Sequence, residues 1–280
     1  MKREVPQSSS SAKGSFVTAF EHLLVDKGTD GVCTITLDRP DRLNAVNAQL
    51  SMELPMAIHE AAADDDVRVV VITGSGRAFC SGLDLRDHNA VSMSTRSERL
   101  DPMRWVGRWV LAITQCDKPV VAAVNGTAAG AGFGLALACD VRVLHSSAVL
   151  TAGYVRRGLS PDAGVSWFLP RIVGHARAME ILLTGRDITA SEAVEIGLAT
   201  VVLEDHSYST GLAKYTSRLA AGPPIALALT KRLMLDSSSS TLESHLRHEL
   251  MHIKTCFESN DLKEALVAFG EKRPPVFRGD

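Results

Sequence analysis

The chain has 280 residues, of which 45% are hydrophobic, and a formal net charge of −2 at pH 7. A chain of this length can bury about 75% of its unfolded surface, which favours one large domain with an appendage over two unrelated domains. The balanced charge gives no sign of a nucleic-acid-binding surface. No segment reaches the ~18 apolar residues of a membrane span, so we expect neither nucleic acid nor membrane as a partner.

The N-terminus and the cysteines indicate the compartment. Met1–Arg3 is followed by serines at Ser8–Ser11 instead of an apolar core, which argues against a secretory signal. Residues 1–17 are expected to form a flexible tail. The five cysteines are scattered, odd in number and without zinc-site spacing. We therefore expect free thiols in a cytoplasmic protein that binds no metal.

The first predicted elements in chain order are a β-hairpin and a helix. Phe20–Asp26 and Val32–Leu37 have the composition of strands and flank a turn that contains Gly28 and Gly31. Asn47 then offers an N-cap for a helix to about residue 62, because apolar residues recur on one of its faces.

Strand and helix patterns alternate from there to about Val202, which predicts an α/β architecture. The remainder is expected to be helical, with Asn260–Asp261 capping the last helix. Within it, Leu242–Phe257 carries an apolar face at helical spacing that needs a partner. We divide the chain into a tail, a core and a C-terminal helical region, at residues 1–17, 18–210 and 211–280.

Two glycine-rich stretches each follow the pattern of a buried strand. Val69–Gly74 leads into Phe79–Leu85, and Pro119–Val124 leads into Asn125–Gly134, which continues as a helical run. Small residues after a strand let the backbone approach a ligand closely. Free N–H groups at a helix start favour negative charge, so two such loops can aim two donors at one developing oxyanion.

At these stretches the chain resembles the crotonase (enoyl-CoA hydratase/isomerase) superfamily. An ordered set of motifs over roughly Phe20 to Phe277 is far more specific than a lone glycine cluster. The resemblance implies a spiral of ββα turns with a C-terminal helical region that forms a homotrimer or a dimer of trimers; periodicity alone leaves a doubly wound sheet open. The further motifs are Leu37–Ala45, Gly158–Gly164, Leu183–Arg186 followed by Ala193 and Gly197–Leu198, and Phe269–Arg273.

The resemblance implies an acyl-CoA thioester as substrate and places the oxyanion donors at the backbone N–H groups of Leu83 and Ala131. Family members often have glycine at the second position, and the alanine methyl is expected to narrow the acyl pocket. One such donor is typically worth ~2.7–4 kcal/mol of transition-state stabilisation. The alternative is that both loops are merely tight turns.

The acid/base groups depart from the family pattern. Dedicated hydratases carry two glutamates, and those positions fall on Gly134 and Tyr154. The tyrosine could donate a hydrogen bond to substrate, but packing is favoured for it. Asp162 is the only carboxylate between residues 148 and 173, and isomerase-type relatives keep an acid at this motif position. One carboxylate suffices for a 1,3-proton shift. Alternatively, Ser160–Asp162 is a helix start in which the aspartate is structural.

Other polar groups near these motifs receive weaker roles. Asp84 and Asp140 are expected to be structural, and His88 is expected to be a surface residue. No histidine occurs between residues 101 and 115, where related aryl-CoA dehalogenases place their base, so dehalogenation is disfavoured.

Coenzyme A enters as part of the substrate, and no separate cofactor is expected. Arg42 resembles the family's basic residue near the CoA phosphates, while Phe269 and Lys272 resemble terminal residues that reach a neighbouring subunit's CoA. Each of these charges could equally be a solvated surface group. The remaining expected contacts around the coenzyme are Leu43, Ala45, Ser81, Gly82, Asp84 and Leu85.

The sequence therefore predicts an acyl-CoA enzyme that stabilises a thioester enolate. Isomerisation with one acid/base group is favoured over two-carboxylate hydration. Two alternatives remain, namely an enoyl-CoA hydratase with another proton donor and a catalytically silent acyl-CoA-binding protein. The orientation of the Asp162 carboxylate distinguishes an enzyme from a silent binder.

Overall fold

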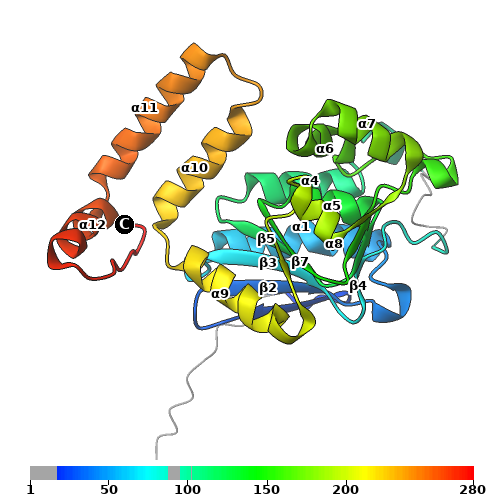
Figure 1. Ribbon diagram of the computed structural model, residues 1–280, viewed down its shortest axis with the longest axis horizontal. Helices are drawn as coiled ribbons and strands as arrows, with labels where there is room; N and C mark the ends of the chain where they lie inside the picture. The colour runs from blue at the N-terminus through cyan, green and yellow to red at the C-terminus, as the bar shows by residue number, and fades with distance from the viewer. Residues whose placement is uncertain (1–17, 88–94, 102) are drawn as a thin grey trace, which may run out of the picture.

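Two β-sheets organise the protein, whose computed structural model describes residues 18–87, 95–101 and 103–280 (Figure 1). The larger has six strands in the order β1-β2-β3-β5-β7-β10. In it, β1 (Leu23–Lys27) and β2 (Val32–Leu37) form the expected antiparallel hairpin, and the other pairs are parallel. The remaining strands are β3 (Val69–Gly74), β5 (Val120–Val124), β7 (Val141–His145) and β10 (Val201–Leu203).

The smaller sheet has the order β4-β6-β8-β9, and only its β8–β9 pair is antiparallel. Successive strands alternate between the sheets: β3, β5 and β7 join the larger one, and β4, β6 and β8 the smaller. This alternation is the expected spiral of ββα turns, and it replaces the doubly wound sheet that the pattern left open. The strands are β4 (Ala78–Cys80), β6 (Thr127–Ala129), β8 (Val149–Thr151) and β9 (Asp187–Thr189).

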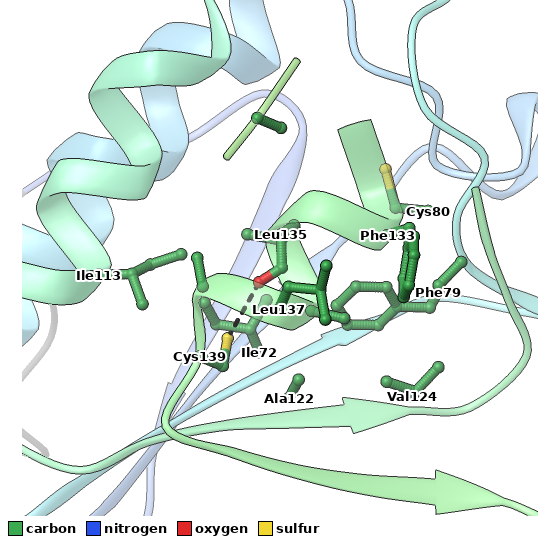
Figure 2. Close-up of a cluster of buried hydrophobic side chains, with 14 of the residues drawn as sticks. Ile72, Phe79, Cys80, Ile113, Ala122, Val124, Phe133, Leu135, Leu137 and Cys139 are labelled. Carbon is green, nitrogen blue, oxygen red and sulfur yellow. Dashed lines mark hydrogen bonds between the residues drawn. The ribbon is translucent and has the colours of Figure 1, made fainter. Parts of the chain in front are cut away.

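Helix α5 (Ala131–Ala138) is buried at every residue and lies inside the spiral. Figure 2 shows its Phe133, Leu135 and Leu137 among side chains of the sheets and of α4 (Val106–Gln115). A helix that is apolar all round must be buried, and here the burial fixes the position of its N-terminus. The other helices of the core are α1 (Ala48–Ala63), α3 (Arg96–Leu100), α6 (Val165–Val173), α7 (His175–Thr184) and α8 (Ala190–Glu195), with the 3₁₀ turns η1 (Pro40–Arg42), η2 (Val155–Arg157) and η3 (Asp205–Ser207).

Of the two helix caps predicted outside the glycine-rich loops and the Asp162 motif, the structure agrees with one. The Asn47 side chain accepts a hydrogen bond from Leu50 N at 2.9 Å and begins α1. The last helix, α12 (Asn260–Glu271), is capped by Ser259, which accepts from Leu262 N at 3.3 Å, so the prediction of Asn260–Asp261 as the cap is wrong. Asp261 instead accepts backbone N–H groups of Arg278 and Gly279 and holds the C-terminal tail.

The C-terminal part is helical, and most of it projects from the core (Figure 1). Helix α9 (Tyr208–Ala220) covers the outer face of the larger sheet, where it packs on Val71, Val121 and Val143. Beyond it follow α10 (Pro224–Asp236), α11 (Leu242–Glu258) and α12. In the described part of the chain, no helix combines the length and the hydropathy needed to cross a membrane.

Charged side chains attach α10 to the core. Lys231 Nζ lies 2.8 Å from Asp140 Oδ2 and also donates to the carbonyls of Ile113 and Lys118. Asp140 in addition accepts from Val120 N at 2.7 Å, which is the structural role expected for it. Burial raises the pKa of Asp140, and the ammonium of Lys231 counters part of that rise.

All five cysteines are free thiols, as expected, and four of them are buried. Burial raises the pKa of Cys33, Cys80 and Cys139 to about 12, so these thiols stay protonated. They serve as small apolar side chains in the core, and Cys139 also donates to the Leu135 carbonyl at 3.3 Å (Figure 2).

Candidate active site

A pocket of about 920 Å³ lies where the two glycine-rich loops meet. Its wall includes Leu83, Ala131 and Asp162, the three residues expected to act in catalysis. The fold thus brings every expected site residue except Phe269 and Lys272 to one cavity. Those expected to contact coenzyme A that line it are Arg42, Leu43, Ala45, Ser81, Gly82, Asp84 and Leu85.

Both expected oxyanion donors have free backbone N–H groups. Val46 N donates to Gly82 O and Asp84 N donates to Val46 O, which fixes the backbone on either side of Leu83. Ala131 is the first residue of α5, where a helix leaves its N–H groups without intrahelical partners. Across the described residues, neither Leu83 N nor Ala131 N donates to a protein acceptor, so both remain available for a ligand.

The two loops touch at Gly82. A methyl group on this residue would lie 2.7 Å from Ala129 O and 3.4 Å from Ala131 N. Gly82 also has a φ of +86°, a conformation that residues with a side chain rarely adopt. Glycine is therefore required here for two reasons, and its use keeps the segments of Leu83 and Ala131 in contact.

Asp162 faces the pocket and is bound by the hydroxyl of Tyr154. The phenol donates to Asp162 Oδ1 at 2.7 Å, with a longer contact of 3.5 Å to the Asp162 carbonyl. Asp162 as a whole residue is exposed and lines the pocket, but its carboxyl is partly buried against neighbouring protein groups. This burial raises its pKa, and the hydrogen bond from Tyr154 lowers it in part.

The helix-start interpretation of Ser160–Asp162 is wrong. Helix α6 begins at Val165, after Gly164 in a left-handed conformation and without a side-chain cap. Ala163 precedes it with a φ of +49°, so the chain turns between Asp162 and the helix. The Asp162 side chain therefore caps nothing and is available to the pocket, as the enzyme interpretation requires. The expectation that Tyr154 merely packs is corrected by the hydrogen bond it donates.

Gly134, one of the two positions at which the resemblance implies a glutamate in hydratases, has no space for a side chain. A methyl group on Gly134 would lie 2.4 Å from the Ala163 Cβ and 2.6 Å from the Ala163 carbonyl oxygen. Helix α5 and the loop that carries Asp162 thus pack without room for a side chain at position 134. On this backbone an acidic side chain at position 134 would collide with the loop that carries Asp162.

Asp84 has the structural partners expected of it. It lies 3.0 Å from Arg39 Nη2 and also accepts from Arg86 N. Burial alone would raise the pKa of Asp84, but these bonds and the charges of Arg39 and Arg42 hold it below its ordinary value. The carboxylate is therefore committed to Arg39 and orders the first loop rather than carrying a proton.

Several residues that shape the pocket were not singled out from the sequence. Buried Asn44 donates to the carbonyls of Ser75 and Ala78 and so ties the entrance of the first loop to the sheet. Trp105 lines the pocket with a φ of +74°, which is strained for a residue with a side chain. No sequence pattern identifies Trp105 as a pocket residue; its position in the structure does. Three further arginines lie on the wall: Arg77, Arg86 and Arg157.

Phe269 and Lys272 lie on or next to α12, away from the pocket of their own chain. Phe269 is 86% exposed. Their expected contact with the CoA of a neighbouring subunit stays a prediction. His88 falls outside the described residues, and within the described ranges no group of three or more His, Cys, Asp or Glu side chains is arranged to hold a metal ion.

The family model for enoyl-CoA hydratase/isomerase matches residues 27–280 of the chain. The chain belongs to the enoyl-CoA hydratase/isomerase family. A solved enoyl-CoA hydratase from Bacillus anthracis superimposes with a TM-score of 0.85 at 32% identity, covering 93% of this chain and all of that one. The crotonase-like fold and membership of an enzyme family are thereby established.

Relatives within the enoyl-CoA hydratase/isomerase family carry names of different reactions. A "Probable enoyl-CoA hydratase" of Rhodobacter capsulatus is 41% identical over 90% of this chain and 96% of its own length. A 1,2-epoxyphenylacetyl-CoA isomerase of Escherichia coli is 35% identical, over 89% and 95%. A 4-chlorobenzoyl coenzyme A dehalogenase of an Arthrobacter species is 36% identical, over 90% and 92%. Similarity alone therefore does not select the reaction.

Proposed function

We propose that this enzyme isomerises an acyl-CoA thioester by moving a proton with Asp162. The proposal rests on two features taken together. The Asp162 carboxyl lines the pocket, where Tyr154 binds it, and position 134 has no space for a second acidic side chain. Three acidic residues line the pocket, but Asp84 is paired with Arg39, and Asp41 lies on η1 beside the expected coenzyme contact Arg42. Asp162, in contrast, is bound by Tyr154, whose ring adjoins the second loop. Asp162 is thus the acid best placed to move a proton.

The reaction then proceeds in two proton transfers. The thioester oxygen accepts hydrogen bonds from the N–H groups of Leu83 and Ala131. The carboxylate of Asp162 takes a proton from a saturated carbon that is next to the thioester carbonyl or joined to it through a C=C bond, and the electron pair of that C–H bond passes into an enolate whose oxygen charge the two donors stabilise. The protonated Asp162 returns the proton to another carbon of the same system, so the acyl group keeps its mass.

Mass-resolved turnover of a panel of enoyl-, aryl- and epoxy-CoA thioesters tests this proposal. Isomerisation changes the retention of the acyl-CoA without changing its mass, and we expect at least one member of the panel to behave in this way. A product heavier by one water would instead establish hydration, the alternative that the R. capsulatus relative favours. Thioester binding without conversion of any member would establish a silent binder.

We further propose that the protein binds no cofactor beyond the CoA of its substrate. The arginines on the pocket wall support the binding of CoA itself, since guanidinium groups suit its phosphates. A cytoplasmic location is also proposed, and the free cysteines support it.

We expect the protein to assemble through the C-terminal helices as a homotrimer or a dimer of trimers. In the isolated chain Leu246, Leu250, Ile253 and Phe257 of α11 are between 46% and 61% exposed, an apolar face that water solvates poorly. Light scattering at micromolar concentration should give a multiple of three chains, and Leu250→Glu should shift the mass toward one chain. A monomer mass for the wild-type protein would contradict the expectation.

A further inference from the structure

The side chain that binds Asp162 stands where hydratases of the family carry a glutamate. Tyr154 is 7% exposed, and its hydroxyl donates to Asp162 Oδ1 at 2.7 Å. Its ring lies beside the second loop, since a methyl group on Gly130 would be 3.9 Å from the ring carbon that bears the hydroxyl. The phenol therefore bridges the loop of the proposed donor Ala131 and the proposed base.

The backbone of Tyr154 is itself held firmly. Its carbonyl accepts from Arg157 N at 2.8 Å and from Leu159 N at 3.1 Å, across the turn η2. Thr151 O accepts from Gly130 N at 3.0 Å, which fixes the start of this segment against the second loop. The hydroxyl is thus presented from a rigid support, and a rigid donor restricts the rotation of the carboxyl that it binds.

We infer that Tyr154 is a positioning residue, whose hydroxyl holds Oδ1 of Asp162 so that Oδ2 is the oxygen that exchanges the proton with substrate. Among the residues that the structure describes, no other residue donates a hydrogen bond to Oδ2. The inference rests on the proposed function, because it assigns a partner to the base of that reaction. The same hydrogen bond favours the ionised form of Asp162, which is the form that removes a proton.

Three influences act on the protonation of Asp162: burial disfavours the carboxylate, whereas the Tyr154 hydroxyl and, to a smaller extent, the backbone N–H of Asp162 itself favour it. Burial and the neighbouring carboxylate raise the pKa of Tyr154, so the phenol stays a donor. Cys80, which acts electrostatically on Tyr154, is protonated and uncharged at neutral pH because burial raises its pKa to about 12. The other charged side chains on the pocket wall are Asp41, Asp84, Arg42, Arg77, Arg86 and Arg157.

Tyr154→Phe tests the inference, since it keeps the buried ring and removes only the hydroxyl. The acid limb of the pH profile of kcat/KM reports the ionisation of the base in the free enzyme, and it should move to higher pH in the variant. We also expect kcat at pH 7 to fall about tenfold with little change in KM, which corresponds to about 1.4 kcal/mol. A ¹³C NMR titration of the Asp162 carboxyl follows the same ionisation without substrate.

Tyr208→Phe is the matched control. The Tyr208 hydroxyl is buried and has no partner among the described residues, and its ring packs edge-on against His145 at 5.1 Å, outside the pocket. Its removal should leave both the acid limb and the NMR titration of Asp162 in place. If Tyr154→Phe also leaves them in place, or if kcat falls without any movement of either, the inference is overturned.

A second variant covers the case in which Tyr154→Phe folds poorly. A fluorotyrosine at position 154 retains the ring and makes the hydroxyl a stronger donor, so the limb should move to lower pH. If the acid limb of the fluorotyrosine variant moves to higher pH or does not move, the inference is overturned. Asp162→Asn separates the two proposals. If that variant keeps full turnover, the proposed function fails. If it is inactive, but the Asp162 titration is the same in the wild type and in Tyr154→Phe, the inference alone fails.

Discussion

Asp162→Asn is expected to reduce isomerase turnover by about 10²–10⁴-fold, the usual contribution of a positioned acid/base group. The amide is nearly isosteric with the carboxyl and can still accept the hydrogen bond of Tyr154, but it cannot take up a proton. Binding of the acyl-CoA should persist, because the coenzyme contacts are elsewhere in the pocket. Steady-state kinetics together with equilibrium binding of the thioester measure the two effects separately.

The fold should tolerate this substitution. Burial raises the pKa of Asp162 above its ordinary value, so ionising it is less favourable in the folded protein than in the unfolded chain. Above that raised pKa the carboxylate therefore opposes folding, and Asp162→Asn at neutral pH should melt at the same or a higher temperature. Asp65→Asn, at an exposed site away from the pocket, is the control for a charge change alone. Undiminished turnover in folded Asp162→Asn would remove the base from the proposal.

Ala131→Pro is the second substitution for which we expect a large effect. Proline has no backbone N–H, and Ala131 is the first residue of α5, a position where proline fits a helix well. The variant should therefore keep α5 and lose one oxyanion donor. Removal of such a donor typically costs about 10²–10³-fold in kcat. Turnover should be measured beside a circular-dichroism melt.

Ala131→Gly provides the comparison, because it keeps the N–H and deletes only the methyl group. It should lose far less turnover than Ala131→Pro. If both variants fold and retain similar turnover, the N–H of Ala131 is not a donor, and the thioester oxygen must bind in another way. If both fall equally, the methyl contact rather than the N–H is what matters at this position.

The elements around the site could be predicted from local patterns. The apolar runs of β3 and β5 indicate buried strands, and the small residues that follow predict close backbone approach, as Gly82 shows. Asn47 is a recognised N-cap, and its contact with Leu50 N is local. These features depend on neighbours in sequence, so their residues carry the signal themselves.

The helix start at Ser160–Asp162 illustrates where such patterns mislead. Serine, proline and aspartate each favour a helix N-terminus, yet Ala163 and Gly164 both adopt left-handed conformations, and α6 begins only at Val165. In the fold Ala163 packs against Gly134, which lies almost thirty residues earlier in the chain, and the local pattern contains no sign of this contact. Tertiary contact overrode the local preference.

The bond between Tyr154 and Asp162 could not be read from sequence for the same reason. It joins two residues across the turn η2 and the loop after it, and its geometry depends on how that loop packs. In the sequence, Tyr154 stands out mainly because it occupies a position where the resemblance implies a glutamate in hydratases. Asn44 was similarly overlooked, because a buried asparagine that ties two loops together has no periodicity to reveal it.

The close contact between Gly134 and Ala163 has a consequence for how this site could be changed. A carboxylate cannot be installed at position 134 on the present backbone, because its Cβ would collide with the Ala163 carbonyl as well as its methyl group. The loop that carries Ala163 would have to move away from α5, and Asp162, the adjacent residue, would move with it. A carboxylate at position 134 and Asp162 in its present position therefore need the same space. Adding the first, by design or in evolution, requires a backbone change that also moves the second.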